Sequence, residues 1–441
     1  MARWLMLSEI WKSKMEIPAS RYRRKHIRSG RIPCGSHFRP LQSQDDSDRD
    51  RQEEPTSIRR IRTLTVRLIV LTAATLPVVC AQSADCNAPA PSASLVIPVP
   101  VKPFAVAVTS DGCWLFVSGE DAVVVLQRHS GHVDVARRVS LPAAGAAGLA
   151  LTHDGGGGGG TAGRQVDFLD AGRLISGASE PFLGSFSDGS QAGSVYAAIT
   201  ADDRMLFVSD EGQQSLTVVD LERSRANGYK DAAIVGRVPV GNGPVGLAFS
   251  PDGKWLYSTS ETGLPQWNWP RTCGGPTEGA VIVVDVARTA KDPAHSVAAR
   301  VPSGCSPVRV APSPDGTRLY VTARGSYSLV VFDAAKLRSD AQHARLAMFY
   351  VGPAPVPVIA VDGGRRVVVG NSNRFAGGQE PETLAVIDAS RVNDGEAAVI
   401  GSVPTGAFPR EMALAPDGRT LFLTNFTSKT LQVIDVARLP R

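Results

Sequence analysis

The feature that most constrains this chain is a short turn, Asp-Gly or a close variant, that recurs about every 45 to 60 residues. In the clearest copy, residues 304–333, one strand ends at Pro314, Asp315 and Gly316, and two further apolar strands follow. Pro presets the φ angle of the first corner, Asp bonds to its own backbone, and Gly accepts the positive φ that other residues resist. A single small sheet cannot bury both of its faces, so the pattern predicts a repeat that stacks on copies of itself.

Two marks recur in a fixed register along the chain. The turn is found seven times, at Asp111-Gly112, Asp154-Gly155, Asp202-Asp203, Asp252-Gly253, Asp315-Gly316, Gly363-Gly364 and Asp417-Gly418. A Pro stands eight residues before most of these turns, at Pro103, Pro244, Pro307, Pro355 and Pro409. Each unit reads as four short strands, which is typical of a propeller blade. The sequence therefore predicts an all-β fold, a seven-bladed β-propeller of four-stranded antiparallel blades.

The two ends of the repeat array complement each other. The last unit stops after its third strand, and a matching strand, residues 94–101, precedes Pro103. We therefore expect the N-terminal strand to complete the last blade and to leave no open edge at the seam. Blade 2 is the poorest copy: its turn is swollen by residues 155–160, and strands are expected at residues 164–170 and 173–180.

The N-terminal region differs from the repeats in composition. Residues 1–58 show no apolar period and are predicted to be a disordered extension. The alternative is that translation begins further along the chain, close to the apolar run. Residues 59–81 combine Arg residues with a short apolar run and are interpreted as a signal peptide, with an uncleaved anchor or a lipoprotein cleavage before Cys80 as alternatives. Residues 82–93 are then a short linker and residues 94–441 the propeller. This organisation predicts an exported protein, periplasmic or extracellular, with no membrane span in the mature chain.

The net charge of +5 is not a property of the repeats, because residues 1–67 carry +8 and the remainder −3. The repeats therefore give no indication of nucleic-acid binding. Four cysteines follow the predicted cleavage site, and an even number in an exported chain suggests two disulfides with three possible pairings.

Propeller geometry chooses between these pairings. The connections from strand 4 to strand 1 and from strand 2 to strand 3 lie on one face, here named the loop face, and the remaining turns lie on the opposite turn face. Cys86 and Cys113 fall on the turn face, whereas Cys273 and Cys305 fall on the loop face. We therefore predict the disulfides Cys86–Cys113 and Cys273–Cys305.

The second strands carry a recurrent signature. Tyr320-Val321-Thr322-Ala323 and Phe422-Leu423-Thr424-Asn425, preceded by SPDGTRL and APDGRTL, resemble the YVTN repeat of the YVTN/lactonase-like β-propellers. The resemblance covers about residues 94–441 and implies the fold more than the activity. It implies a group that includes exported binding or surface proteins, subunits of redox enzymes, and lactone hydrolases.

Register brings charged residues to the loop face. The residue five positions after the first apolar residue of strand 2 is a carboxylate in three blades and an Arg in a fourth. The residue two positions after the anchor Pro lies at the head of the inner strand. The candidate ligand-binding residues from these two counts are Glu120, Glu211, Glu261, Arg324, Arg309, Glu411 and Tyr196. Charges at the head of an inner strand must be solvated, paired or used.

Two insertions add candidates on the loop face. Residues 262–279 contribute Trp267 and Trp269, and residues 371–382 contribute Arg374. Aromatic and Arg residues on long loops often bind a partner. The alternative is that the tryptophans pack the loop onto its neighbour.

Three functions agree with this sequence. The first is a non-enzymatic scaffold that binds a protein partner or a small polar ligand through the loop face and central channel. The alternative is a lactone hydrolase, in which Glu211 or Glu261 acts as a base and Arg309 or Arg324 stabilises the oxyanion. The third is an accessory subunit of a periplasmic redox enzyme. The seven His residues form no spaced pair, so neither a metal site nor a cofactor is expected.

Overall fold

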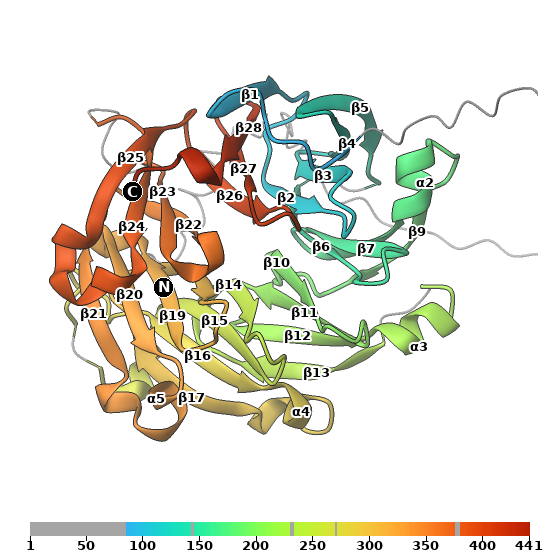
Figure 1. Cartoon of the computed structure of the whole chain (residues 1–441). Coiled ribbons are helices and arrows are strands. Elements are labelled where there is room, and N and C mark those ends of the chain that lie inside the picture. The colour runs from blue at the N-terminus through green and yellow to red at the C-terminus, as the bar shows by residue number, and fades with distance from the viewer. Residues whose placement is uncertain (1–84, 143–144, 230–232, 270, 375–379) are drawn as a thin grey trace, which may run out of the picture. The chain divides into compact units, whose positions relative to one another are not determined.

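The computed structural model describes residues 85–142, 145–229, 233–269, 271–374 and 380–441. In them the chain forms seven four-stranded antiparallel sheets, the blades of a propeller (Figure 1). The predicted extension and signal peptide, together with the first residues of the predicted linker, lie outside the described residues.

Blades 1 to 4 follow one another in the chain, and each runs outward from its first strand. Their strands are β2 (Ala105–Val108), β3 (Trp114–Gly119), β4 (Ala122–His129) and β5 (His132–Ser140); β6 (Ala146–Leu151), β7 (Gly157–Ala162), β8 (Gln165–Asp170) and β9 (Phe182–Ser187); β10 (Ser194–Ile199), β11 (Met205–Asp210), β12 (Ser215–Asp220) and β13 (Ile234–Pro239); and β14 (Asn242–Phe249), β15 (Trp255–Thr262), β16 (Ala280–Asp285) and β17 (Val297–Pro302).

Blades 5 and 6 continue this pattern, and blade 7 takes its outer strand from the other end of the propeller. The strands are β18 (Pro307–Pro312), β19 (Arg318–Ala323), β20 (Ser328–Asp333) and β21 (Arg345–Tyr350); β22 (Pro355–Val361), β23 (Arg366–Asn371), β24 (Thr383–Asp388) and β25 (Val399–Pro404); and β26 (Pro409–Leu414), β27 (Thr420–Asn425), β28 (Thr430–Asp435) and β1 (Ser94–Pro98).

Short helices connect the third and fourth strands or lie within the loops. The α-helices are α2 (Ala171–Ser176), α3 (Leu221–Ala226), α4 (Val286–Thr289) and α5 (Lys336–Ser339), and the 3₁₀ helices are η1 (Pro265–Trp267), η2 (Pro293–His295), η3 (Arg324–Ser326), η4 (Ala341–His343), η5 (Asp362–Gly364), η6 (Ala389–Ala398) and η7 (Val436–Arg438). No helix among the described residues is long and apolar enough to cross a membrane.

The first strands of the seven blades surround a common axis. Each of β2, β6, β10, β14, β18 and β22 contacts the first strand of the following blade, and β26 contacts β2. The cores lie between neighbouring blades; for example, Tyr320 and Val331 of blade 5 pack with Val367 and Ala385 of blade 6. Because both faces of strands 2 and 3 are covered, these strands read as continuous apolar runs rather than alternating ones.

The seam joins segments from the two ends of the propeller. β1 pairs with β28 in antiparallel register, with Ser94 opposite Ile434. Arg128 of blade 1 adds a bridge to blade 7, because its buried guanidinium bonds Asp417 at 2.7 Å and the Thr420 hydroxyl at 2.6 Å.

The two predicted disulfides are present. Cys86–Cys113 ties the segment before β1 to the β2–β3 turn, with 4.9 Å between the Cα atoms. Cys273–Cys305 ties the β15–β16 loop to the connection into blade 5, with 5.5 Å between the Cα atoms. Two disulfides are compatible with an exported protein.

Blade 2 departs from its prediction in two places. The glycine run expected as a swollen turn is largely strand β7, which pairs with both β6 and β8. The strand expected at residues 173–180 is wrong, since its first residues belong to helix α2, N-capped by Asp170 and terminated at Gly177 with φ 75°. An Asp at the end of strand 3 favours a helix start there, and Asp220 and Asp285 cap α3 and α4 in the same way.

A buried hydroxyl links the inner strands. Near the head of the first strand the register of most blades shifts by a β-bulge, which leaves backbone N–H groups without a ladder partner. In blade 3 the Ser209 hydroxyl accepts a bond from the Tyr196 N–H at 3.1 Å and donates to the Val245 carbonyl of blade 4 at 2.9 Å. Equivalent hydroxyls donate to the next blade from Ser118, Thr322 and Thr424.

Blade 6 lacks both halves of this arrangement. Gly370 stands where the hydroxyl would be, and Pro357, which has no N–H, stands where the donor would be. A Cβ on Gly370 would lie 2.6 Å from the Pro357 ring. The two departures therefore compensate each other, because a strand head without a donor needs no acceptor.

Substitution of Ser209 tests this link. Ser209→Ala leaves a buried N–H and a buried carbonyl of adjacent blades without their partner, so we expect a loss of about 1–3 kcal/mol in the free energy of unfolding. Urea denaturation of the protein measures it. The exposed Ser179→Ala is the control and is expected to be neutral; equal stability of the two variants would contradict the assigned role.

Candidate functional site

The heads of the inner strands converge on the propeller axis. Tyr196, Arg309 and Glu411 occupy equivalent positions in blades 3, 5 and 7. The same position holds Gly148 and Gly246 in blades 2 and 4, where a Cβ would lie within 3 Å of the backbone of the next blade. Alternation of small and large residues thus lets three long side chains from different blades reach one another.

These three side chains form a buried group. Arg309 Nε lies 3.1 Å from Glu411 Oε2, and Arg309 Nη1 donates to its neighbour's carbonyl, Val308 O, at 3.0 Å. The Arg309 guanidinium carbon lies 4.8 Å from the centre of the Tyr196 ring. Burial, together with the charge of Glu411, raises the pKa of the Tyr196 hydroxyl beyond its usual range. The predicted charges at the strand heads are therefore paired and buried rather than solvated.

Arg410, which was not among the residues predicted from the sequence, is the second feature of this region. Its guanidinium carbon lies 3.6 Å from the centre of the Phe104 ring, with Phe408 and Phe426 at 5.4 and 5.7 Å. The residue is 7% exposed, its Nε has no hydrogen-bond partner, and no described residue forms an ion pair with it.

Desolvation makes this cation costly. Burial, followed by the charges of Arg309 and Arg374, holds the pKa of Arg410 well below its usual range, against the opposing influence of Glu411 and Glu211. An Arg side chain nevertheless keeps its proton in proteins, because its ordinary pKa is so high. Arg410 is thus a buried positive charge in need of a counter-charge.

A register signal could have identified Arg410. It directly follows the anchor Pro409, and the residues in the same position after the other anchor prolines are Phe104, Val245, Val308 and Val356. A charged residue at a repeat position that is apolar in the other blades therefore indicates a candidate site residue.

Four predicted loop-face residues lie with Arg410. Arg324 Nη2 is 2.6 Å from Glu261 Oε1. Arg374 lies over Phe408, its guanidinium carbon 5.6 Å from the ring centre. Glu211 is half-buried beside them.

The pKa of Glu211 reflects this environment. Burial, and next the negative charge of Glu261, raises it to about 7, while Arg324, Arg410 and Arg374 act in the opposite direction. Glu211 therefore changes its charge near neutral pH, unlike an ordinary carboxylate.

We name the electrostatically coupled set the axial cluster; its members are Glu211, Glu261, Arg309, Arg324, Arg374, Arg410 and Glu411. Four are guanidinium groups and three are carboxyl groups, so the set carries an excess of at least one positive charge. A partly desolvated set of charges is most stable when it is neutral. The axial cluster is therefore suited to a negatively charged group.

The remaining predicted residues do not join this cluster. Glu120 is exposed, and its carbonyl accepts the N–H groups of Gly145 and Ala146. Trp267 and Trp269 pack against each other, with ring centroids 4.9 Å apart, and against the core between blades 3 and 4. For the tryptophans the structure thus agrees with the alternative, in which they pack the loop.

A second acidic group lies between blades 2 and 3. Asp188 and Asp210 are both buried, and Arg237 binds each of them, at 2.9 and 3.1 Å. The Thr217 hydroxyl also bonds each carboxyl group. Burial and the neighbouring Asp188 raise the pKa of Asp210 to about 8. At neutral pH Asp210 therefore retains its proton, and the group holds the β9–β10 connection against blade 3.

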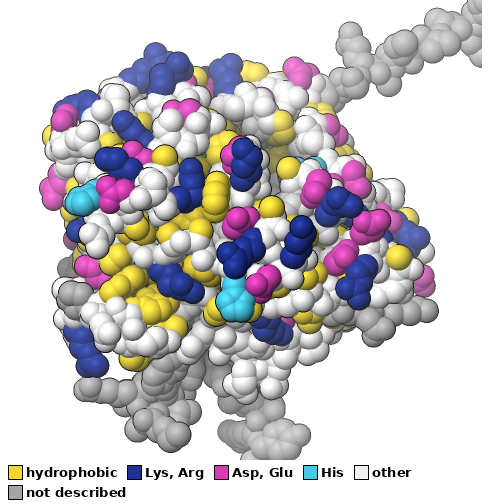
Figure 2. All heavy atoms as spheres, turned by 90° about the horizontal axis from the view of Figure 1, so that it is seen from below, with side chains coloured by type: hydrophobic (Ala, Val, Ile, Leu, Met, Phe, Trp, Pro, Cys, Tyr) yellow, Lys and Arg dark blue, Asp and Glu magenta, His cyan; other side chains and the backbone are white. Residues whose placement is uncertain are grey.

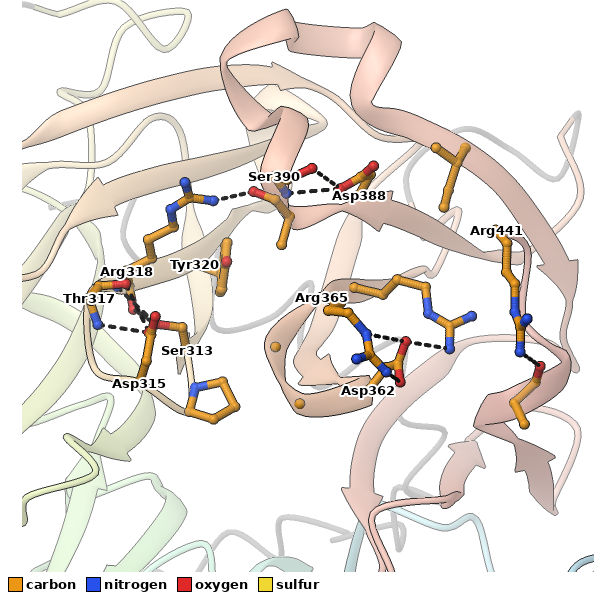
Figure 3. A pocket seen from close by; sticks show the side chains of 17 residues that line it. Ser313, Asp315, Thr317, Arg318, Tyr320, Asp362, Arg365, Asp388, Ser390 and Arg441 are labelled. Carbon is orange, nitrogen blue, oxygen red and sulfur yellow. Dashed lines mark hydrogen bonds and ion pairs between the residues drawn. The ribbon is translucent and has the colours of Figure 1, made fainter.

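The turn face carries a hollow of about 860 Å³ between blades 5 and 6, shown in Figure 3. The polar groups that line it bond mostly to one another: Asp315 to the Thr317 N–H at 3.0 Å, Asp362 to Arg365, and Asp388 to Ser390. These contacts close turns and helix ends, which explains the carboxylates without a ligand.

The outer rim has an apolar strand. Leu346, Met348 and Tyr350, alternate residues of β21, are 39 to 44% exposed. Figure 2 shows apolar side chains gathered among Lys, Arg, Asp and Glu on one side of the molecule.

Within the described ranges, no group of three His, Cys, Asp or Glu side chains is arranged to hold a metal ion.

Architecture and sequence comparison agree on the class of this protein, a seven-bladed β-propeller. Residues 189–348, within blades 3 to 5 and their connections, match the family model described as "Lactonase, 7-bladed beta-propeller". With seven blades present, the chain is similar to the lactonase-like seven-bladed propellers.

Comparison with individual proteins supports the fold but indicates no activity. No curated protein matches the sequence. Among solved structures, a chain of hydrazine synthase from Kuenenia stuttgartiensis is similar, with 18% identity and a TM-score of 0.59 over 77% of this chain and 97% of that chain. At this identity the similarity shows a shared fold only.

The carboxyl pair predicts a pH dependence of stability. Because the folded-state pKa of Asp210 is raised, the folded protein retains a proton that the unfolded chain loses above about pH 4, so stability falls as the pH rises towards about 8. Between pH 6 and 8 this group alone would cost roughly 2 kcal/mol.

Asp210→Asn removes this titration, and its urea-unfolding free energy is expected to vary less with pH than that of the wild type. The exposed Glu180→Gln is the control and should follow the wild type. Parallel pH profiles for Asp210→Asn and the wild type would show that Asp210 does not retain its proton in the folded protein.

Proposed function

We propose that this chain is an exported, non-enzymatic binding protein that takes a small polar ligand on its loop face, at the axial cluster. The observation that carries the proposal is the convergence of seven charged side chains from blades 3 to 7 around the axis. Several of these side chains stand on or directly beside strands, and the β-bulges and interblade hydroxyl bonds fix their backbone. A rigid, charged and partly desolvated site of this kind is preorganised for a ligand.

Export is supported by two observations. The two disulfides favour an oxidising compartment, and residues 59–81 have the composition of a signal peptide. In the proposed organisation residues 1–58 are an extension and residues 82–93 join the leader to the propeller. A small ligand is preferred to a protein partner because the unbalanced charge lies on nearly buried side chains near the axis, where a flat protein surface has little access.

Thermal shift and calorimetry with small acids, amines, sugars and alcohols test the binding function. We expect at least one saturable ligand, with affinity lowered at least tenfold in the double variant Glu261→Gln/Arg324→Gln, which removes a salt bridge without leaving one charge alone. The exposed pair Asp121 and Arg138, replaced by Asn and Gln, is the matched control. Failure of every probe, or equal affinity in both double variants, would overturn the proposal.

Lactone hydrolysis is a second candidate, favoured by the pKa of Glu211 near 7, which suits a general base at neutral pH. Glu211 would take a proton from water as the oxygen adds to the lactone carbonyl. Arg324 or Arg410 would stabilise the oxyanion, and the ring C–O bond would then break, with the leaving oxygen receiving the proton.

Kinetics on a panel of lactones test this candidate. The rate is expected to rise with pH through about 7 and to fall at least 100-fold in Glu211→Gln. Glu120→Gln, at the equivalent position of blade 1, is the control and should retain full activity. Absence of turnover, or equal rates in the two variants, would exclude the hydrolase.

A further inference from the structure

We infer that the ligand of the axial cluster carries a carboxylate group, and that Arg410 is the side chain that binds it. This inference rests on the proposed binding function and names the chemical class of its ligand.

Two unpartnered donors point to an acceptor. Arg410 Nε and Arg309 Nη2 are buried and have no hydrogen-bond partner, and both residues are more than nine-tenths buried. A buried guanidinium N–H without an acceptor is costly, more so than a neutral donor. A ligand oxygen placed between blades 5 and 7 would remove this cost, whereas an amine or an alkyl group would not.

The orientation of Arg410 selects the geometry of that acceptor. With Phe104 3.6 Å from its centre, the guanidinium lies against an aromatic ring, and Phe408 and Phe426 stand further out. Its N–H groups lie in the plane of the guanidinium, so they remain available at its edge. A planar carboxylate matches such an edge with two parallel hydrogen bonds.

The charge balance favours a single negative charge. Four guanidinium groups face three carboxyl groups, so one monoanion makes the ionised cluster neutral. A phosphate monoester carries nearly two charges at neutral pH and would exceed this requirement when Glu211 is ionised. The same balance disfavours a cationic ligand, which would add to the excess.

Ligand binding is coupled to the protonation of Glu211. The charged groups that face it are Glu261 from β15, Arg324 from η3, Arg374 after β23, and Arg410 from β26. A ligand carboxylate on Arg410 adds negative charge beside Glu211 and favours its protonated form. Above about pH 7 Glu211 is ionised in the free protein, so binding then requires proton uptake and the affinity falls as the pH rises.

Three aromatic probes of nearly equal shape test the class: benzoate, neutral benzamide and cationic benzamidine, with inorganic phosphate as a fourth. Calorimetry on the protein at pH 6 and pH 8.5 is expected to show saturable binding of benzoate only, at least fivefold weaker at the higher pH. Arg410→Gln should weaken benzoate at least tenfold. The exposed Arg138→Gln is the control, and near-UV circular dichroism shows that each variant is folded.

Glu211→Gln keeps the inference falsifiable if Arg410→Gln does not fold. In this variant benzoate binding is expected to persist and to lose its pH dependence. Preference for benzamidine, benzamide or phosphate over benzoate would overturn the inference but leave the binding function intact. The same holds for undiminished benzoate binding in folded Arg410→Gln. Absence of binding by every small molecule in the wider panel would overturn both.

Discussion

The propeller depends on buried hydroxyl groups that join the heads of its inner strands. Except in blade 6, the head of the inner strand has a backbone N–H without a ladder partner, and in most blades a Ser or Thr of the second strand accepts it. In alternate blades the same hydroxyl donates to a carbonyl of the following blade, and Thr424 does so across the seam. A polar group that would be costly if unpaired thus sets the spacing between blades.

The site is a consequence of the same bulges. An inserted residue changes the side on which the following side chains project, and here it aims Tyr196, Arg309 and Glu411 at the axis. Glycine in the intervening blades leaves room for them. The fold therefore supplies seven similar strand heads, and the exceptions to the repeat, Arg410 above all, supply the chemistry.

The features that recur in a fixed register along the sequence were sufficient to predict the blades and the disulfides. Asp-Gly turns and anchor prolines identified seven blades, and the order of strands sorted four cysteines into two pairs. Blade 2 was misjudged because glycines in β7 carry no side-chain pattern, so pairing with neighbours alone makes them a strand.

The site was only partly predictable for a related reason. Register located Glu211, Glu261 and Arg324 on one face. The ion pair between blades 5 and 7 and the contacts of Asp188 with blade 3 instead join residues from different parts of the ring. Such contacts depend on how the blades pack. The position of Arg410 was visible in the repeat as a charge among apolar residues; its stacking on Phe104 was not.

The seam sets the order in which the molecule can be completed. Gln432 bonds Ser94, 338 residues earlier in the chain, and Arg128 reaches Asp417 over a separation of 289 residues. The ring is not closed until β28 has been synthesised, because before that moment β1 has no strand partner. Contacts so remote in sequence make for slow folding. A chain that closes so late emerges from the ribosome in an open form.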